Sequence, residues 1–391
     1  MTNPVVAIIK SGQWKWALFN KNHPEYSAIF DLIERHSNEL DFVLIGTSGR
    51  APLHRSNMKK KVTVWDIPDN GIVGNLTYNL QLIKILIQNR PGVVIMFGTG
   101  ALVPALLSSF VSLRTKVIPI LVNGFGYYGG KALSRVFYLA QLNLALLSLR
   151  APAFRLPNIF ALSASIRDTI TKLSPNLKGK ITLISYPISP LFCPSKKLQP
   201  ETNATPTILT VAAIDPRKGL DVLIKAVSLI PIELKPNVII NGQIRDQCYM
   251  QQLKNMVTTM DLEKWVKFNQ GVPYDDLPLL YQSATIFVLP TRDEGTPVVV
   301  LEALHCGLPV IATPVGGIPD IIVNGVNGML IKPDDPLELK NAILLLLADK
   351  NLRLSFARNS VNELNSHYYN RLTLKEALER SIDSLKAANV N

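Results

Sequence analysis

Short apolar runs rich in β-branched residues recur along the first half of the chain, and Gly or Pro bounds most of them. They occupy residues 5–9, 42–46, 62–67, 92–98, 116–122 and 181–187. Stretches of helical length lie between most of these runs, for example residues 75–89 and 131–149. Strands that alternate with helices are typical of a parallel sheet with helices on both faces. We therefore expect an α/β fold.

The same pattern starts again in the second half, with apolar runs at 207–213, 237–242, 265–270, 285–290, 309–313 and 328–331. The intervening residues 193–206 are polar, contain several prolines and lack periodicity, as expected of a linker. We predict two doubly wound, Rossmann-like domains, residues 1–199 and 200–366. A C-terminal helix in residues 367–391 is a candidate to pack back on the first domain. A length of 391 residues suits two domains of ~150–200 residues each.

Composition excludes several other classes of protein. Hydrophobic residues make up 47% of the chain and charged residues 18%, so the chain can bury a large core and is not globally disordered. The cysteines Cys193, Cys248 and Cys306 lack the paired spacing of a metal site or a disulfide framework. No apolar run reaches the ~20 residues of a membrane span, and the first residues do not resemble a signal peptide. We expect a cytoplasmic protein, either free or peripheral on the inner face of a membrane.

The positive charge is confined to the first half of the chain. Residues 1–200 contain 23 Lys and Arg against 8 Asp and Glu, a net charge of +15, whereas residues 201–391 have a net charge of −3. This imbalance indicates an anionic partner, such as an anionic membrane surface or a phosphorylated acceptor, although a solvated basic face would explain it too. The run Lys59-Lys60-Lys61 lacks interleaved aromatic residues, so we expect no nucleic acid partner.

Residues 288–319 contain the densest set of candidate functional groups, in a pattern of strand, loop, helix, strand and loop. Thr296 suits the N-cap of the helix, Pro297 its first position and Gly307 the residue after its end. The amides of the first helical turn would then be free to bind an anion.

Two glutamates in this segment have the spacing Glu-x7-Glu. Glu294 lies in the loop before the helix, where a side chain can enter the crevice beyond a parallel strand, and Glu302 lies near the second helical turn. Carboxylates accept paired hydrogen bonds from vicinal hydroxyls. The arrangement fits a ligand with sugar or ribose hydroxyls at both ends and phosphate between them, as in a nucleotide-sugar.

The string EGTPVVVLEALHCGLPVIATPVGGIPDII resembles the donor-site signature of the retaining GT-B glycosyltransferases of family four, also called glycosyl transferases group one. The residues that match in order and spacing are Glu294, Gly295, Glu302, Ala303, Gly307, Pro309, Gly316 and Gly317. The resemblance covers most of residues 205–365. It implies a GT-B fold, with two Rossmann-like domains facing a central cleft, and a donor that is bound by the second domain. The donor contacts that it implies in this string are Glu294, Gly295, Thr296, Pro297, Val298 and Glu302.

The resemblance also implies roles for residues outside this string. Lys218 would bind the donor diphosphate, and Val272 would face the nucleobase through its backbone. Ala212-Ala213 replaces the usual Gly-Arg of the family, and it is open whether Arg217 supplies the missing cation. Gly12 is placed like the glycine loop that approaches the donor phosphate, whereas the histidine often found after the fourth strand of the family is absent.

Residues 123–150 combine a glycine-rich aromatic loop with a basic, apolar helix. The stretch is similar to one in family members that act on polyprenol-linked sugars. Lys131, Arg135 and Arg150 would then meet a diphosphate or lipid headgroups. A buried helix of the first domain explains the pattern at least as well.

The main hypothesis is a retaining glycosyltransferase of the hexosyltransferase type, which moves a sugar from a nucleotide-sugar to a hydroxyl acceptor such as a lipid-linked or polysaccharide precursor. Glu294 and Lys218 are the candidate catalytic residues. No Asp-x-Asp pair or His/Cys cluster follows a strand, so we expect no metal, and the nucleotide-sugar is a co-substrate rather than a cofactor. Two alternatives remain: a nucleotide-sugar epimerase of the same fold, and a non-catalytic nucleotide-sugar-binding partner subunit.

Overall fold

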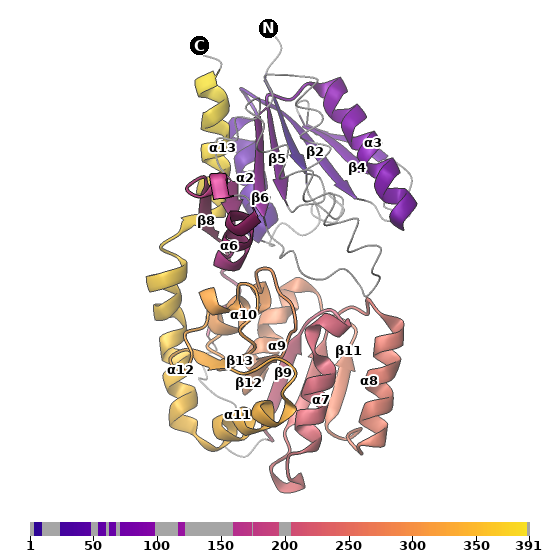
Figure 1. The fold of residues 1–391 in the computed structure, drawn as a ribbon, viewed down its shortest axis with the longest axis vertical. Coiled ribbons are helices and arrows are strands. Elements are labelled where there is room, and N and C mark those ends of the chain that lie inside the picture. The colour runs from indigo at the N-terminus through magenta and orange to yellow at the C-terminus, as the bar shows by residue number, and fades with distance from the viewer. Residues whose placement is uncertain are drawn as a thin grey trace. The chain divides into compact units, whose positions relative to one another are not determined.

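The computed structural model of the chain describes residues 4–9, 24–47, 54–59, 62–67, 71–97, 116–121, 159–173, 175–194 and 205–388. The chain forms two compact units (Figure 1). The first contains residues 1–187 and 372–391, and the second contains residues 188–371. Each unit is an α/β structure built on its own sheet.

The first unit is built on a sheet that, in the described residues, has nine strands in the order β15-β8-β7-β6-β5-β1-β2-β4-β3. Only the pair β3–β4 in this sheet is antiparallel among the described strands. The strands are β1 (Val5–Ile9), β2 (Asp41–Thr47), β3 (His54–Lys59), β4 (Val62–Ile67), β5 (Val93–Phe97), β6 (Lys116–Leu121), β7 (Ile159–Ala161), β8 (Ile181–Ser185) and β15 (Leu372–Thr373). The helices are α2 (Pro24–His36), α3 (Gly71–Asn89), α6 (Ala164–Leu173) and α13 (Leu374–Ala388).

Helix α13 brings the C-terminal part of the chain back to the first unit. Glu379 on this helix accepts hydrogen bonds from Arg35 Nη1 at 2.6 Å and pairs with His36 Nε2 at 2.8 Å, both at the end of α2. The apolar side of α13 is buried through Ala377, Leu378 and Ile382. The strand just before it, β15, pairs in parallel with β8. The last helix is therefore an integral part of the first unit.

The second unit contains, in its described residues, a six-stranded parallel sheet in the order β11-β10-β9-β12-β13-β14. The strands are β9 (Thr207–Val211), β10 (Asn237–Asn241), β11 (Val266–Asn269), β12 (Ile286–Leu289), β13 (Val310–Ala312) and β14 (Gly328–Leu330). The helices are α7 (Leu220–Ser228), α8 (Gln247–Thr259), α9 (Leu277–Ser283), α10 (Val298–His305), α11 (Pro336–Ala348) and α12 (Lys350–Glu363).

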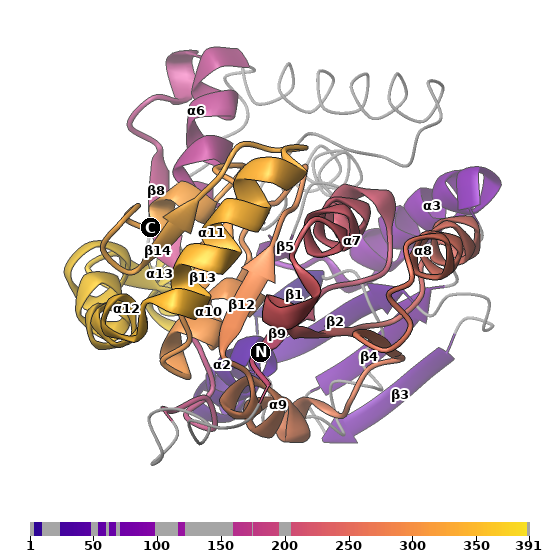
Figure 2. The same cartoon turned by 90° about the horizontal axis from the view of Figure 1, so that it is seen from below.

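The strand order of the second sheet reverses between β9 and β12. From β9 the chain proceeds to β10 and β11 on one side, and from β12 to β13 and β14 on the other. Helices α7, α8 and α11 pack together on one face of the sheet, and α9 and α10 pack together on the opposite face (Figure 2). Open α/β sheets bind their ligands beyond the carboxyl ends of the strands at such a reversal. The loops that follow β9 and β12 are therefore the first place to look for a site.

The predicted strands of the described residues all exist, within one or two residues at most ends. Three further strands, β3, β7 and β15, were not predicted. β3 has the polar sequence HRSNMK and lies at the sheet edge beside β4, so it lacks the apolar run that marks a buried strand. β7 and β15 are only three and two residues long. Such short strands depend on pairing with neighbours rather than on a local pattern.

The division between the units lies at Pro187 and Ile188, earlier in the chain than the predicted boundary near Gln199. The physical reason is that the ring of Phe192 packs edge-on against Tyr274 and Tyr281, with centroids 5.5 and 5.7 Å away. The carbonyl of Cys193 also accepts a hydrogen bond of 2.9 Å from Gln282. The start of the proline-containing stretch is thus packed into the second unit.

In the described ranges, no helix has the length and apolarity that crossing a membrane requires.

Candidate active site

Two loops flank the reversal of strand order at the carboxyl edge of the second sheet. Residues 212–219 follow β9, and residues 290–297 follow β12. Lys218 from the first loop and Glu294 from the second form a direct ion pair through Nζ and Oε1. Their side chains are only 14% and 10% exposed. The two predicted catalytic residues therefore meet at the place where the topology favours ligand binding.

A tight turn places Lys218 at the end of the first loop. Residues Pro216–Lys218 form a short 3₁₀ turn, and the Asp215 carboxylate caps it by accepting a hydrogen bond of 2.9 Å from the Arg217 amide. Gly219 ends the turn with φ +64°, and a Cβ there would lie 1.9 Å from the carbonyl oxygen of Pro290. Only glycine permits this approach, so the sequence Lys-Gly allows the two loops to touch.

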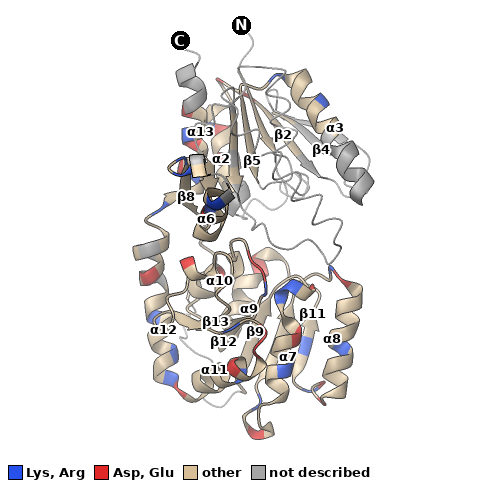
Figure 3. Ribbon diagram, viewed as in Figure 1, with Lys and Arg blue, Asp and Glu red and all other residues tan. Residues whose placement is uncertain are grey.

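Arg217 is adjacent to Lys218 but has a different environment. Its guanidinium group pairs with Asp215, with Nη2 to Oδ2 at 2.9 Å and Nε to Oδ1 at 3.2 Å. Figure 3 shows basic residues where the chain enters α7, and these two are the last before that helix. Arg217 is therefore engaged within its own turn, whereas Lys218 reaches across to the neighbouring loop.

A third loop, after β13, supports the backbone at Glu294. The amide of Gly317 donates a hydrogen bond of 2.9 Å to the carbonyl of Gly295. Gly316 has φ +57°, and a Cβ at this position would lie 1.7 Å from the Glu294 carbonyl oxygen. The Gly-Gly pair thus serves as more than a turn, because it allows the loop after β13 to touch the loop that contains Glu294.

The predicted start of helix α10 was wrong by one residue. The helix begins at Val298, and Pro297 is its N-cap with ψ 82°, outside the helical range. The Thr296 side chain makes no cap, and the Thr296 carbonyl instead accepts a hydrogen bond of 3.0 Å from the Val298 amide. The Val298 amide is therefore already used, and the first turn offers fewer free donors to an anion than predicted.

The predicted end of α10 is confirmed. Gly307 follows the last helical turn with φ +74°. Its amide donates to Leu304 at 3.0 Å, and the Leu308 amide donates to Ala303 at 3.0 Å. These two bonds are the pair that define a Schellman motif, in which a left-handed glycine satisfies the last carbonyls of a helix.

Glu302 lies inside α10 in a buried, aromatic environment. The residue is 3% exposed, and its Oε2 accepts a hydrogen bond of 2.8 Å from Tyr281, which is fully buried. Burial raises the pKa of Glu302 to about 8, although hydrogen bonds from Tyr281 and Tyr274 oppose the shift. Glu302 is therefore held as a largely neutral carboxyl at pH 7.

The structure adds a charged network that sequence reasoning missed. Arg292 lies two residues before Glu294 and pairs through both terminal nitrogens with Asp221 on α7, at 2.9 Å each. Tyr249 on α8 donates a further hydrogen bond of 2.7 Å to Asp221 Oδ1. A buried aspartate at a helix start and an arginine in a strand-end loop are the only signals that the sequence contained.

The remaining predicted residues lie at varied distances from this pair. Val272 is half-buried in the loop after β11, at the same edge of the sheet but on its outermost strand. Gly242, in the strand-end turn after β10, lies so close to Ala212 that a Cβ would be 1.9 Å from the Ala212 carbonyl oxygen. Gly12 and residues 123–150 lie outside the described residues, so their predicted roles stay predictions.

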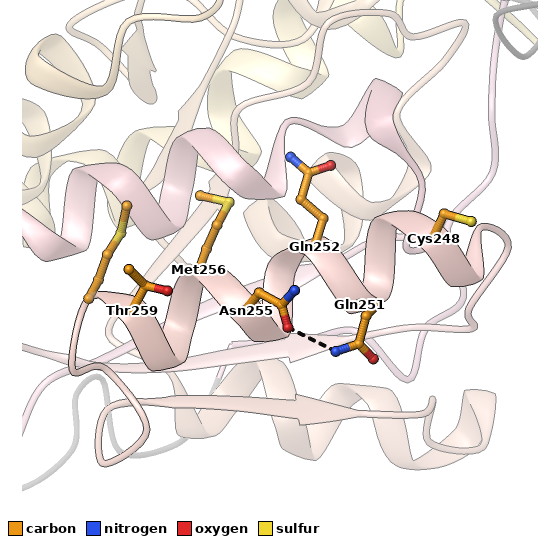
Figure 4. Close-up of a pocket in the computed structure, with 7 residues that line it drawn as sticks. Cys248, Gln251, Gln252, Asn255, Met256 and Thr259 are labelled. Carbon is orange, nitrogen blue, oxygen red and sulfur yellow. Dashed lines mark hydrogen bonds between the residues drawn. The ribbon is translucent and has the colours of Figure 1, made fainter.

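A surface cavity of about 580 Å³ lies elsewhere in the second unit, along one side of α8 (Figure 4). Its lining residues are Cys248, Gln251, Gln252, Asn255, Met256, Thr259 and Met260. They include none of the predicted site residues.

Across the ranges that the structure describes, no group of three or more His, Cys, Asp or Glu could hold a metal ion.

The sequence comparisons match the second half of the chain. Residues 195–363 match the family model described as glycosyl transferases group 1. A GDP-mannose-dependent alpha-(1-6)-phosphatidylinositol monomannoside mannosyltransferase of Mycolicibacterium smegmatis is 31% identical over 157 residues, which cover 37% of this chain and 39% of that protein. The chain spans about two fifths of the length of the curated relatives that it matches.

Comparisons of structure extend over nearly the whole chain. Sucrose-phosphate synthase from Thermosynechococcus elongatus superposes with a TM-score of 0.75 at 14% identity, covering 99% of this chain and 100% of that one. Anabaena HepE, solved in complex with UDP-glucose, superposes with a TM-score of 0.72 at 18% identity, covering 98% and 99%. The chain therefore has the GT-B fold of glycosyltransferases, and residues 195–363 match the glycosyl transferases group 1 family.

Proposed function

We propose that the protein transfers a glycosyl group from a nucleotide-sugar to a hydroxyl acceptor, with retention of configuration at the anomeric carbon. The observation that supports this most is the Lys218–Glu294 ion pair at the reversal of strand order, within residues that match the glycosyl transferases group 1 model. A cation and a carboxylate placed side by side suit a ligand that presents a diphosphate next to sugar hydroxyls.

In the proposed reaction the bond between the anomeric carbon and the donor phosphate oxygen breaks, and a bond to the acceptor oxygen forms on the same face of the sugar. The acceptor proton passes to the departing phosphate. Lys218 donates to the diphosphate and stabilises the charge that grows on it, and Glu294 accepts hydrogen bonds from the sugar hydroxyls. The donor diphosphate must therefore compete with Glu294 for the Lys218 ammonium group.

The base and the sugar of the donor follow from a direct assay. One relative is a GDP-mannose-dependent enzyme, and one structural neighbour was solved with UDP-glucose. Both compounds are therefore the first donors to test. Purified protein is incubated with each donor and with soluble and lipid-linked acceptors, and proton NMR of the product reads the anomeric configuration. A product with inverted configuration would contradict the retaining mechanism.

The same assay separates the two other candidate functions. Interconversion of the nucleotide-sugar without an acceptor would indicate an epimerase. Donor binding without transfer or hydrolysis would indicate a non-catalytic partner subunit, which the replacement of Gly-Arg by Ala212-Ala213 keeps open.

We further propose an acceptor at, or derived from, an anionic membrane surface. The support is the net charge of +15 in residues 1–200 against −3 in residues 201–391. Each basic residue near an anionic bilayer contributes ~1 kcal/mol, and salt screens the attraction. The intact chain should co-sediment with anionic vesicles at low salt, less so at high salt, and not with neutral vesicles. Sedimentation with neither lipid would argue for a soluble acceptor, and equal sedimentation with both would show that charge does not drive the binding.

A further inference from the structure

Arg292, two residues before Glu294, makes several side-chain hydrogen bonds, including one of 2.7 Å from Nε to Asp334 Oδ1. Its terminal nitrogens bind the two oxygens of Asp221 at 2.9 Å each, and Nη1 also donates to the carbonyl of Pro216 at 2.6 Å. The Arg292 side chain is 28% exposed and that of Asp221 is 10% exposed. A planar fork that faces a carboxylate in this way defines both distance and orientation.

The Asp221 end of this contact is itself fixed. Tyr249 donates its hydroxyl proton to Asp221 Oδ1 at 2.7 Å, and the same hydroxyl accepts from the Asp221 amide at 3.1 Å. Burial alone would raise the pKa of Asp221, but hydrogen bonds from Arg292 and Tyr249 outweigh it and hold the pKa below its usual value. Arg292 is therefore paired with a carboxylate that is charged at neutral pH and anchored to two helices, α7 and α8.

The backbone at Arg292 also bonds to the turn that contains Lys218. The Arg292 amide donates to the carbonyl of Arg217 at 2.6 Å, and the hydroxyl of Thr291 donates to that carbonyl at 3.0 Å. On the other side of Lys218, Gly219 touches Pro290. Residues 290–292 thus hold the Lys218 turn before and after the lysine, and Glu294 follows two residues later.

We propose that Arg292, through its paired hydrogen bonds with Asp221, is a positioning residue that holds the Lys218 turn at a fixed distance from the Glu294 loop. This inference rests on the proposed function, because it assigns Lys218 to the donor diphosphate. It explains how Lys218 stays in place when the diphosphate displaces Glu294 from it: the turn is held by contacts that involve neither the Lys218 ammonium group nor the Glu294 carboxylate.

The experiment is a double-mutant cycle between Arg292→Met and Lys218→Ala in the full chain. Calorimetry measures the dissociation constants of UDP and GDP, and the transfer assay measures kcat and KM. Arg292→Met should lower kcat ~10–100-fold, the scale of an ångström-sized misplacement, and should weaken binding of the nucleoside diphosphate. In the Lys218→Ala background the same substitution should change both quantities little, because Arg292 acts through Lys218.

The matched control is Lys225→Met. Lys225 is 51% exposed and lies 3.9 Å from the same Asp221 carboxylate. Its substitution therefore removes a cation but keeps the paired hydrogen bonds between Arg292 and Asp221. Both kcat and binding should remain at the wild-type level. If Arg292→Met does not fold, Arg292→Lys takes its place, because it keeps the charge but loses the paired geometry. Its unfolding temperature verifies the fold.

The outcomes distinguish this inference from the proposed function. If the wild type transfers sugar but the losses in kcat and binding of Arg292→Met and Lys218→Ala add fully in the double variant, the positioning role of Arg292 is overturned. The proposed function is not. A wild type that binds UDP or GDP but never transfers a sugar would overturn the transfer reaction, and the binding cycle would still decide the role of Arg292. A wild type that binds neither nucleotide would overturn both.

Discussion

Glu294 and Glu302 belong to one short motif, yet the structure gives them opposite surroundings. Glu294 lies in a loop at the sheet edge and is paired with the Lys218 ammonium group. Glu302 is 3% exposed, is bonded to Tyr281 and has a pKa raised to about 8 by burial. Two glutamates of one motif can therefore have different roles: one carboxyl is paired with a cation in a loop, and the other is buried within a helix against a tyrosine.

The largest effect is expected from Glu294→Gln. Transfer should fall by ~10²-fold or more, since the sugar loses its charged acceptor and Lys218 loses its partner. The single variant should also lose some stability, because it leaves a largely buried ammonium group unpaired. The double variant Glu294→Gln/Lys218→Met should regain that stability without regaining activity, as measured by urea unfolding and the transfer assay. Wild-type turnover in the single variant would remove the assignment of this pair.

Lys218→Ala, which removes the other half of the pair, should lower kcat by ~10²-fold, the scale for losing one preorganised charge. Arg217→Ala should cost only a few-fold, because the Arg217 guanidinium is already occupied by Asp215. Steady-state kinetics of the two neighbouring variants gives a matched comparison. An equal loss in both would mean that Arg217 leaves Asp215 and supplies the cation missing at Ala213.

The buried glutamate should show itself in the pH dependence of stability. In the unfolded chain Glu302 ionises near ~4.3, whereas in the folded chain its pKa is about 8. The contribution of Glu302 to the free energy of unfolding is thus fully present below pH ~4.3. It decreases as pH rises toward 8, by at most ~1.4 kcal/mol per pH unit. Urea unfolding of the wild type and of Glu302→Gln at pH 5, 6, 7 and 8 measures the difference. The Gln variant should lack this slope, and parallel curves would show that Glu302 is charged when folded.

The same Glu302→Gln variant should weaken binding of nucleoside diphosphate, by ~10-fold if a ribose hydroxyl donates to this carboxyl. The reason is that glutamine places an NH₂ group, which can only donate, where the carboxyl has its second oxygen. Calorimetry with UDP and GDP makes the measurement, with Glu294→Gln as the comparison, which should affect kcat more than nucleotide binding. Unchanged affinity in Glu302→Gln would separate the buried carboxyl from the nucleotide.

The smallest expected effect is that of a chelator. If Lys218 neutralises the diphosphate, transfer should continue unchanged in excess EDTA. A bound metal would alter the comparison, since Glu294 would then serve as its ligand rather than as the partner of Lys218. Loss of activity in EDTA that Mg²⁺ or Mn²⁺ restores would contradict the metal-independent mechanism.

Much of the fold was predictable because buried parallel strands leave apolar runs, as at β1, β5 and β12. The meeting of Lys218 and Glu294 followed in outline, since each comes after a strand of one sheet. The pairing of Arg292 with Asp221 did not follow, because 71 residues separate them and neither lies in a distinctive pattern. The prediction of Thr296 as the N-cap was wrong for a local reason: Pro297 adopts a non-helical ψ and takes the cap position itself.

The return of the chain to the first unit has a consequence for synthesis on the ribosome. Strand β15 pairs with β8 through Leu372 and Ile184, and α13 then buries Leu378 and Ile382. The first unit therefore lacks strand β15 and helix α13 until residues 372–388 leave the exit tunnel. The second unit, residues 188–371, is continuous and is complete before them. Although nascent domains generally fold from the N-terminus onward, here the second unit can finish first, and the first unit must wait until residues 372–388 have been made.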